Sequence, residues 1–99
     1  MAEHATLTAR PRTIIGKQVR GLRRSGRLPG IIYGPGIAIP QPVSVDTYDF
    51  EHLFRRVRTT NPVELTVNGE RHLVFIRRVE RDPVRQEILN VEFYAPSPA

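Results

Sequence analysis

The chain has 99 residues, a charged fraction of 25%, a formal net charge of +5 and no cysteine. A chain of this length makes one domain, and the lack of cysteine excludes disulfide bonds and thiolate metal sites. The first residues contain no apolar stretch typical of a signal peptide, and no segment approaches the roughly 18 apolar residues of a membrane-spanning helix. We therefore expect neither export nor membrane insertion.

The positive charge is concentrated near the N-terminus. Residues 1–30 contain seven of the fifteen basic side chains and one of the ten acidic ones, whereas residues 31–99 contain eight basic and nine acidic side chains. Charge gathered on one element indicates a polyanionic partner. Fourteen of the fifteen basic residues are arginine, which binds phosphates and guanine edges bidentately. Codon bias is an alternative explanation for arginine over lysine, but it does not explain the clustering.

The N-terminal part predicts a strand followed by a short basic helix. Residues 5–10 alternate apolar and polar side chains, which indicates a strand. Residues 16–25 are expected to form a helix that ends at Gly26. One side of this helix is basic through Lys17, Arg20, Arg23 and Arg24. These charges could form only a solvated face, but none has an acidic neighbour for i,i+4 pairing, so a phosphate backbone explains the helix better.

The middle of the chain predicts two more strands and a longer helix. The strands are expected at residues 31–33 and 42–46, separated by a Gly-Pro-Gly loop. Asp46 is a candidate N-cap for the helix that follows. Its apolar stripe has the spacing i, i+3, i+4 and i+7 and consists of Phe50, Leu53, Phe54 and Val57.

The C-terminal part predicts a hairpin and a last strand. Residues 63–67 alternate, and Asn68 with Gly69 is typical of a type I′ turn leading into a return strand at 71–79. A last strand is expected at 86–94. Its two faces are Leu89, Val91 and Phe93, expected in the core, and Ile88, Asn90, Glu92 and Tyr94, expected outside.

These elements predict a mainly β fold in one domain, residues 1–94, with residues 95–99 as a disordered tail. Six short alternating strands with two or three short helices indicate antiparallel-type pairing. Six such strands avoid exposed edges most simply by closing into a six-stranded barrel.

No arrangement of side chains predicts catalysis or a metal site. His4, His52 and His72 lack the spacing of metal ligands, and no carboxylate pair suits acid–base chemistry. The pair Gly16 and Lys17 lacks the upstream glycine of a phosphate-binding loop. We expect that the protein is not an enzyme.

Three segments carry a family signature, and they occur in the family's order. Residues 16–34 have a Gly-Lys start, a Leu-Arg-Arg core and a Tyr-Gly end. Residues 79–84, Val-Glu-Arg-Asp-Pro-Val, correspond to a Val-Gln-Arg-Asp-Pro turn. In residues 90–93, Asn90 and Glu92 replace the His and Asp of a His-x-Asp-Phe pattern. Through these segments, nearly the whole chain resembles the bacterial ribosomal protein L25 family, which includes the general stress protein Ctc.

The resemblance implies a closed six-stranded barrel and a structural role in the large (50S) ribosomal subunit of the cytoplasm. It implies a protein that is monomeric when free and binds the loop E region of 5S ribosomal RNA through a widened minor groove. The basic helix and the last strand would make the contacts. Carried over by position, the RNA-binding residues are Arg10, Lys17, Arg20, Arg23, Arg24, Tyr33, Asn90 and Glu92. No cofactor is implied apart from Mg²⁺ bound by the RNA.

The amide of Asn90 and the carboxylate of Glu92 suit the guanine amino groups and 2′-hydroxyls of an RNA minor groove. A carboxylate facing RNA implies contact with a base edge or bound Mg²⁺ instead of phosphate. An alternative from another class is a non-ribosomal, stress-related interaction protein whose basic helix docks an acidic partner. Many relatives continue into a second β-domain, so the chain is either a one-domain member or a truncated form.

Overall fold

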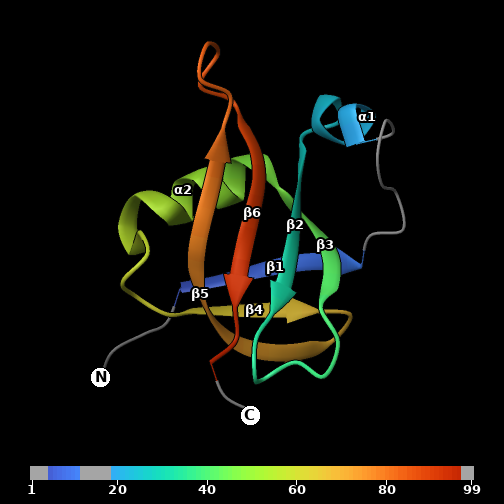
Figure 1. Ribbon diagram of the computed structural model, residues 1–99, viewed down its shortest axis with the longest axis vertical. Coiled ribbons are helices and arrows are strands. Elements are labelled where there is room, and N and C mark those ends of the chain that lie inside the picture. The colour runs from blue at the N-terminus through green and yellow to red at the C-terminus, as the bar shows by residue number, and fades with distance from the viewer. Residues whose placement is uncertain (1–4, 12–18, 97–99) are drawn as a thin grey trace.

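Six strands close into a barrel, and two helices lie beside it (Figure 1). The structure, a computed structural model, describes residues 5–11 and 19–96. The strands are β1 (Ala5–Pro11), β2 (Arg27–Tyr33), β3 (Gln41–Asp46), β4 (Val63–Val67), β5 (Glu70–Arg81) and β6 (Ile88–Tyr94). The helices in these residues are α1 (Val19–Arg24) and α2 (Thr47–Val57). No helix in the described ranges is long and apolar enough to cross a membrane.

The strand order around the barrel is β1-β3-β2-β6-β5-β4. The predicted closed six-stranded barrel is confirmed, but the expectation of antiparallel-type pairing is wrong for two of the six strand pairs. β1 pairs with β4 in parallel, and β2 pairs with β6 in parallel. Alternation of side chains reports which face a residue occupies but not the direction of the neighbouring strand. The parallel pairs join strands that are far apart in the chain, as parallel pairing requires.

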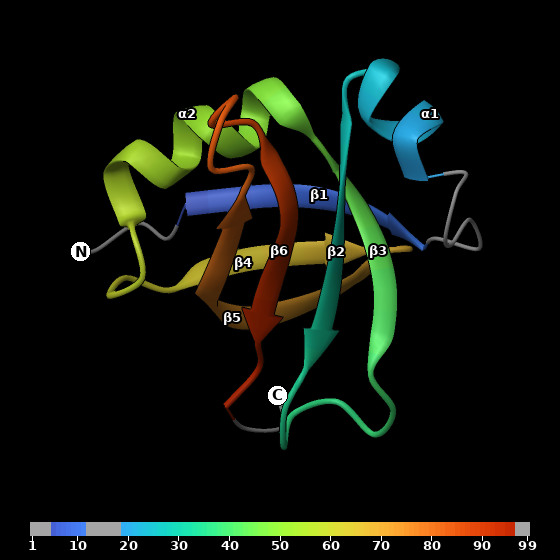
Figure 2. The same ribbon diagram turned by 45° about the horizontal axis from the view of Figure 1, so that its top comes forward.

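Helix α2 covers one end of the barrel, next to β1 (Figure 2). It begins where predicted, because Asp46 Oδ2 accepts a hydrogen bond from the Asp49 amide at 2.9 Å. Phe50 is fully buried, and its ring meets the ring of Phe93 edge-on with centroids 6.2 Å apart. The apolar stripe of α2 therefore closes this end of the core.

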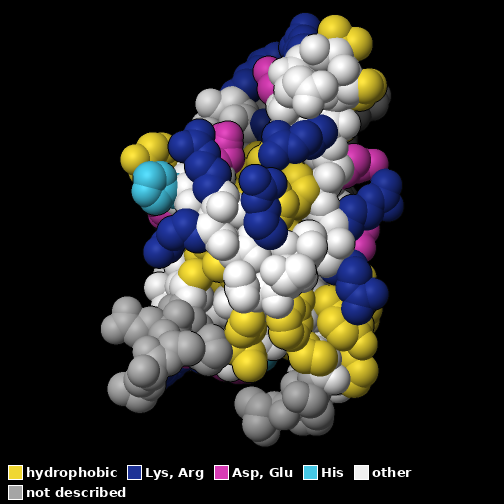
Figure 3. Space-filling view, turned by 90° about the vertical axis from the view of Figure 1, so that its left-hand side faces the viewer, with side chains coloured by type: hydrophobic (Ala, Val, Ile, Leu, Met, Phe, Trp, Pro, Cys, Tyr) yellow, Lys and Arg dark blue, Asp and Glu magenta, His cyan; other side chains and the backbone are white. Residues whose placement is uncertain are grey.

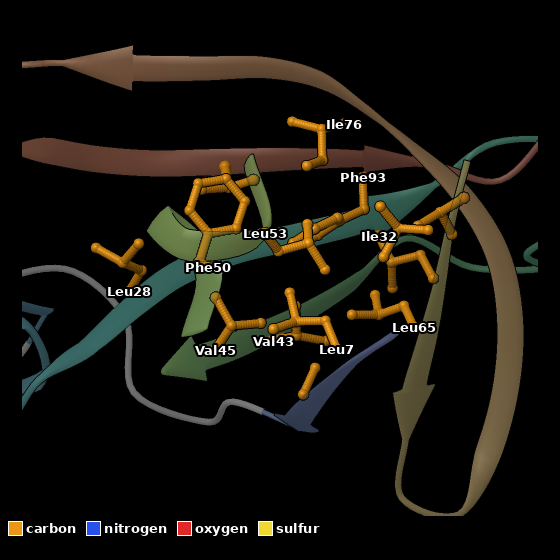
Figure 4. Close-up of a cluster of buried hydrophobic side chains, with 14 of the residues drawn as sticks. Leu7, Leu28, Ile32, Val43, Val45, Phe50, Leu53, Leu65, Ile76 and Phe93 are labelled. Carbon is orange, nitrogen blue, oxygen red and sulfur yellow. The ribbon is translucent and has the colours of Figure 1, made fainter. Parts of the chain in front are cut away.

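The core is continuous through the barrel and consists of inward side chains from all six strands and α2 (Figure 4). Its largest fully buried members are Phe50, Phe93, Ile32, Leu65 and Ile76. Truncating one of them to alanine typically costs about 2–5 kcal/mol of unfolding free energy.

The β4–β5 hairpin has the predicted two-residue turn. Asn68 and Gly69 both have positive φ, 52° and 86°, and Val67 is in register with Glu70. This is the conformation that a type I′ turn requires.

The last strand differs from its prediction at its start. Glu80 is in register with Asn90 and Arg81 with Ile88, so a bulge leaves Leu89 without a partner. The bulge turns Ile88 into the core, where it is 5% exposed, while Leu89 is half-buried. The prediction that Leu89 belongs to the core and Ile88 to the outside was wrong, because alternation fails across a bulge.

Ala95, the first residue of the predicted tail, packs against the barrel. Ala95 is 2% exposed, and its amide donates to the Tyr33 carbonyl at 2.7 Å. Its own carbonyl accepts from the Gly36 amide at 3.0 Å. Residues 97–99 lie outside the described residues.

Candidate nucleic-acid interface

The outward face of β6 lies between β2 and β5 (Figure 1). Val91 and Phe93 are fully buried, so the half-buried side chains of Asn90 and Glu92 point outward. The alternation predicted for the last strand is thus confirmed from Asn90 onward. We call this outward region the β6 strip, formed by Tyr33, Arg77, Arg78, Asn90, Glu92 and Tyr94.

Tyr33 and Glu92, which the family resemblance assigns to one RNA-binding surface, are in contact. The Tyr33 hydroxyl donates a hydrogen bond to Glu92 Oε1 at 3.2 Å. The parallel pairing of β2 with β6 places Tyr33 in register with Tyr94, and the two rings meet edge-on at 5.6 Å. Burial raises the pKa of Tyr33, and the hydrogen bond to Glu92 adds to this rise. The phenol, which is protonated at neutral pH like any tyrosine, therefore keeps its proton to higher pH.

Two arginines of β5 complete the strip and were missed from the sequence. Arg78 Nη1 lies 3.8 Å from Glu92 Oε2 and so forms an ion pair with the oxygen that Tyr33 does not bind. The Arg77 guanidinium lies over the Tyr94 ring, 4.1 Å from its centroid. A bulge between Ile76 and Arg78 leaves both arginines exposed. Two successive arginines in an otherwise alternating strand were the signal that could have revealed them.

Helix α1 lies where β2 begins and contains three of the predicted basic residues, Arg20, Arg23 and Arg24. Arg23 is half-buried, Arg24 is exposed, and both line a groove of about 960 Å³. The groove also contains Arg85 and three acidic side chains, Glu51, Asp82 and Glu87. Arg20 lies on α1, but its side chain is outside the described part of the structure, and so is the whole of Lys17.

The β5–β6 turn that borders this groove is fixed by one carboxylate. Asp82 Oδ1 accepts hydrogen bonds from the amides of Val84 at 2.8 Å and Arg85 at 2.9 Å. The hydrogen bond from the Arg85 amide, followed by that from Val84, lowers the pKa of Asp82. This contact explains why the Arg-Asp-Pro pattern suits the turn.

Arg27 has an intramolecular role, although it belongs to the N-terminal charge cluster. Its guanidinium donates to the Ser44 carbonyl at 2.8 Å and to Ser44 Oγ at 3.1 Å, and Ser44 is 5% exposed. Burial lowers the pKa of Arg27, and the nearby charge of Arg10 lowers it further. Arg27 therefore ties β2 to β3.

Arg10 lies at the far side of the candidate surface. It is exposed on β1, in register with Ser44 of β3, which is in register with Pro29 of β2. Three strand spacings of about 4.8 Å separate β1 from β6, so Arg10 lies about 14 Å around the sheet from β6.

The chain matches one family model and several curated proteins. Residues 7–93 match the model of the ribosomal L25p family. Over 96 residues the chain is 51% identical to the large ribosomal subunit protein bL25 of Thermomicrobium roseum, covering 97% of this chain and 43% of that protein. The bL25 of Roseiflexus castenholzii is 43% identical, with coverage of 96% and 44%. The general stress protein Ctc of Bacillus subtilis is 37% identical, with coverage of 90% and 44%. The chain thus spans less than half the length of these relatives.

Proposed function

Because the chain belongs to the ribosomal L25p family, we propose that it is a structural component of the large ribosomal subunit that binds 5S ribosomal RNA. One observation carries the RNA-binding part of the proposal. The β6 strip holds an outward carboxylate, Glu92, in a defined position between Tyr33 and Arg78. A carboxylate held in this way is suited to recognise hydrogen-bond donors on RNA.

A carboxylate in an RNA-binding surface has an electrostatic cost, since phosphates repel it. The ion pair with Arg78 offsets part of this repulsion. An ionised carboxylate offers about four acceptor positions, of which Tyr33 and Arg78 use two. The remaining positions are available for guanine amino groups or 2′-hydroxyls in the minor groove of loop E. Asn90, on the same face of β6, adds an amide that can both donate and accept.

The two parts of the surface have different tasks in this proposal. Arg23 and Arg24 of α1, together with Arg10, Lys17 and Arg20, neutralise phosphates and supply most of the affinity. The β6 strip reads base edges and supplies specificity. Because α1 leads directly into β2, the strand that carries Tyr33, the two parts are held by adjacent segments of the chain.

Glu92→Ala tests this assignment, because a purely electrostatic surface should bind RNA more tightly after a negative charge is removed. We expect 5S RNA binding to weaken by about 1–3 kcal/mol, the effect of losing one base-edge contact. Binding to an unrelated hairpin of equal length should stay the same or improve slightly. Arg20→Ala should weaken both RNAs to a similar degree.

The measurement is an anisotropy titration of each protein against both RNAs at one fixed salt concentration. Tighter binding of 5S RNA by the Glu92→Ala protein would contradict the role of β6 as a base-reading strand.

A further inference from the structure

Helix α2 carries a second candidate surface, separate from the β6 strip. We call it the α2 surface, formed by Tyr48, His52, Arg55 and Arg56. α2 packs mainly against β1 and β3, and its Phe50 meets Phe93 on the buried side of β6, whereas the β6 strip lies on the outward side of β2, β6 and β5. Figure 3 shows the side of the molecule on which α2 lies. Arginine side chains are spread across this side, and a histidine lies at the edge of the view.

The aromatic part of this surface is a stacked pair. The rings of Tyr48 and His52 are nearly parallel, with an interplanar angle of 20° and centroids 5.6 Å apart. Tyr48 is 72% exposed, so the pair is open to solvent. Burial of Phe50, Leu53 and Val57 directs the opposite side of α2, where this pair lies, away from the core. An exposed aromatic pair of this kind presents a flat π surface.

The basic part continues along the same side of the helix. Residues at i, i+4, i+7 and i+8 share one helix face, which places Arg55 and Arg56 after the ring pair. A rise of 1.5 Å per residue separates Tyr48 from Arg55 by about 10 Å along the axis. Among the described residues, no carboxylate lies within ion-pair distance of Arg55, Arg56 or Arg58.

Helix stability accounts for only part of this arrangement. Basic side chains in the last turn interact favourably with the helix dipole, which explains two arginines near the C-terminus of α2. It does not explain why an aromatic pair is exposed beside them. Arginines that bind phosphates and rings that stack on bases are the combination used by proteins that bind unpaired nucleotides.

We propose that the α2 surface binds a second segment of RNA, with an unpaired base stacked on Tyr48 and the adjoining phosphates on Arg55 and Arg56. This inference rests on the proposed function in that it places the protein among ribosomal RNA. Protein interfaces also use tyrosine and arginine, but the buried centre of such an interface normally contains further apolar side chains. Here Tyr48 is the one large apolar side chain of α2 that is exposed. Its exposed neighbours on the helix are polar or charged, and they include the acidic Asp49 and Glu51 as well as Arg55 and Arg56.

The test uses the full chain, first saturated with unlabelled 5S RNA so that the β6 strip is occupied. Fluorescein-labelled octaadenylate is then titrated and followed by anisotropy, with 5S RNA alone as the blank. The variants are Tyr48→Ala and the double change Arg55→Gln with Arg56→Gln. Tyr48→Phe keeps the ring, and Arg71→Gln removes an exposed charge from β5, so these two proteins are the matched controls.

We expect Tyr48→Ala to weaken octaadenylate binding by about fivefold or more, the lower bound for loss of one stacked base. The double arginine variant should weaken it further and reduce its salt dependence. Both controls should stay within about twofold of the parent, as should the affinity of all variants for 5S RNA.

Unchanged octaadenylate binding by Tyr48→Ala would overturn the proposal. Competition by octaglutamate as effective as that by unlabelled octaadenylate would also overturn it, in favour of an acidic protein partner. If 5S RNA itself does not bind, the proposed function fails. The same variants titrated without 5S RNA then still show whether α2 binds octaadenylate.

Discussion

The hydroxyl of Tyr33 gives the sharpest test of how the β6 strip works. Tyr33→Phe removes the donor that binds Glu92 Oε1 at 3.2 Å and keeps the ring that packs on Tyr94. If the hydroxyl acts by positioning Glu92, its loss should affect recognition of 5S RNA more than it affects folding. If Tyr33 contacts the RNA by itself, its effect should be independent of Glu92.

The magnitude follows from the geometry of the contact. A hydrogen bond to a charged group contributes about 1.5–3 kcal/mol, but 3.2 Å is long for a hydroxyl donor. Glu92 is also partly exposed, so we expect the loss of unfolding free energy to be about 1 kcal/mol or less. Fixing a Glu side chain has an entropy cost of up to about 2 kcal/mol. In Tyr33→Phe the ion pair with Arg78 remains and still offsets part of this cost. We therefore expect 5S RNA to bind about fivefold more weakly.

The assay is a double-mutant cycle with Tyr33→Phe, Glu92→Ala and the double variant, each titrated with 5S RNA. A positioning role predicts that Tyr33→Phe has little further effect once Glu92 is alanine, because the group that it positions is gone. Tyr48→Phe is the matched control, since it removes an exposed hydroxyl from the distant helix α2. Additive effects, or an equal loss in the control, would refute the positioning role.

An independent measurement on the protein alone checks the hydrogen bond itself. The pKa of Tyr33 is raised, so the folded state holds the phenolic proton more tightly than the unfolded state. The associated stability is complete below about pH 10 and is lost as the pH rises beyond it. In an ultraviolet titration, the Tyr33 transition, identified by its loss in Tyr33→Phe, should move to lower pH in the Glu92→Ala protein. If the transition does not move, the contact is absent in solution.

Three further predictions concern the basic helix, the hairpin and the β5–β6 turn. Replacing Arg20 and Arg23 with glutamine should reduce the slope of log K for 5S RNA against log salt by about one to two units, and an unchanged slope would place α1 away from the RNA. Changing Asn68 and Gly69 to valine forces positive φ on two β-branched residues at about 1–3 kcal/mol each, so the melting temperature should fall markedly; equal melting would contradict the type I′ turn. The lowered pKa of Asp82 contributes stability that is present above about pH 4 and lost as the pH falls through the folded-state value. The melting temperature of Asp82→Asn should therefore drop less between neutral and acid pH than that of the parent protein. An equal drop in the two proteins would contradict this contribution.

The hydrophobic pattern was sufficient to predict the barrel, because each strand has one buried face and each helix one apolar stripe. It was insufficient for strand direction, as the parallel pairs β1·β4 and β2·β6 show. The pairing between distant strands depends on how the whole sheet closes, and a short stretch of sequence does not show this. The bulge at Leu89 was missed for a related reason, because it depends on register with β5.

The candidate site, like the fold, could be predicted from the sequence only in part. Tyr33, Asn90 and Glu92 were proposed from the family resemblance, and the alternation of β6 supported an outward position for the last two. That Tyr33 bonds to Glu92 depends on the pairing of two strands about sixty residues apart, so sequence reasoning could not derive it. Arg27 shows the limit of counting charge, because it belongs to the N-terminal cluster of basic residues although Ser44 binds its guanidinium.

The three segments that carry the family signature also build the candidate surface. The first supplies α1 and β2, and it contains Gly30, where a Cβ atom would lie 2.9 Å from the Val91 carbonyl oxygen and 3.3 Å from the Phe93 ring. A side chain at this position would push β2 away from β6, and the Tyr33 hydroxyl would lose Glu92. The second segment supplies Asp82, which fixes the turn leading into β6. The third contains Asn90 and Glu92 themselves. Gly30 therefore permits the close approach of β2 to β6, and Asp82 fixes the turn that precedes β6, so signature residues help to set the position of the Glu92 carboxylate.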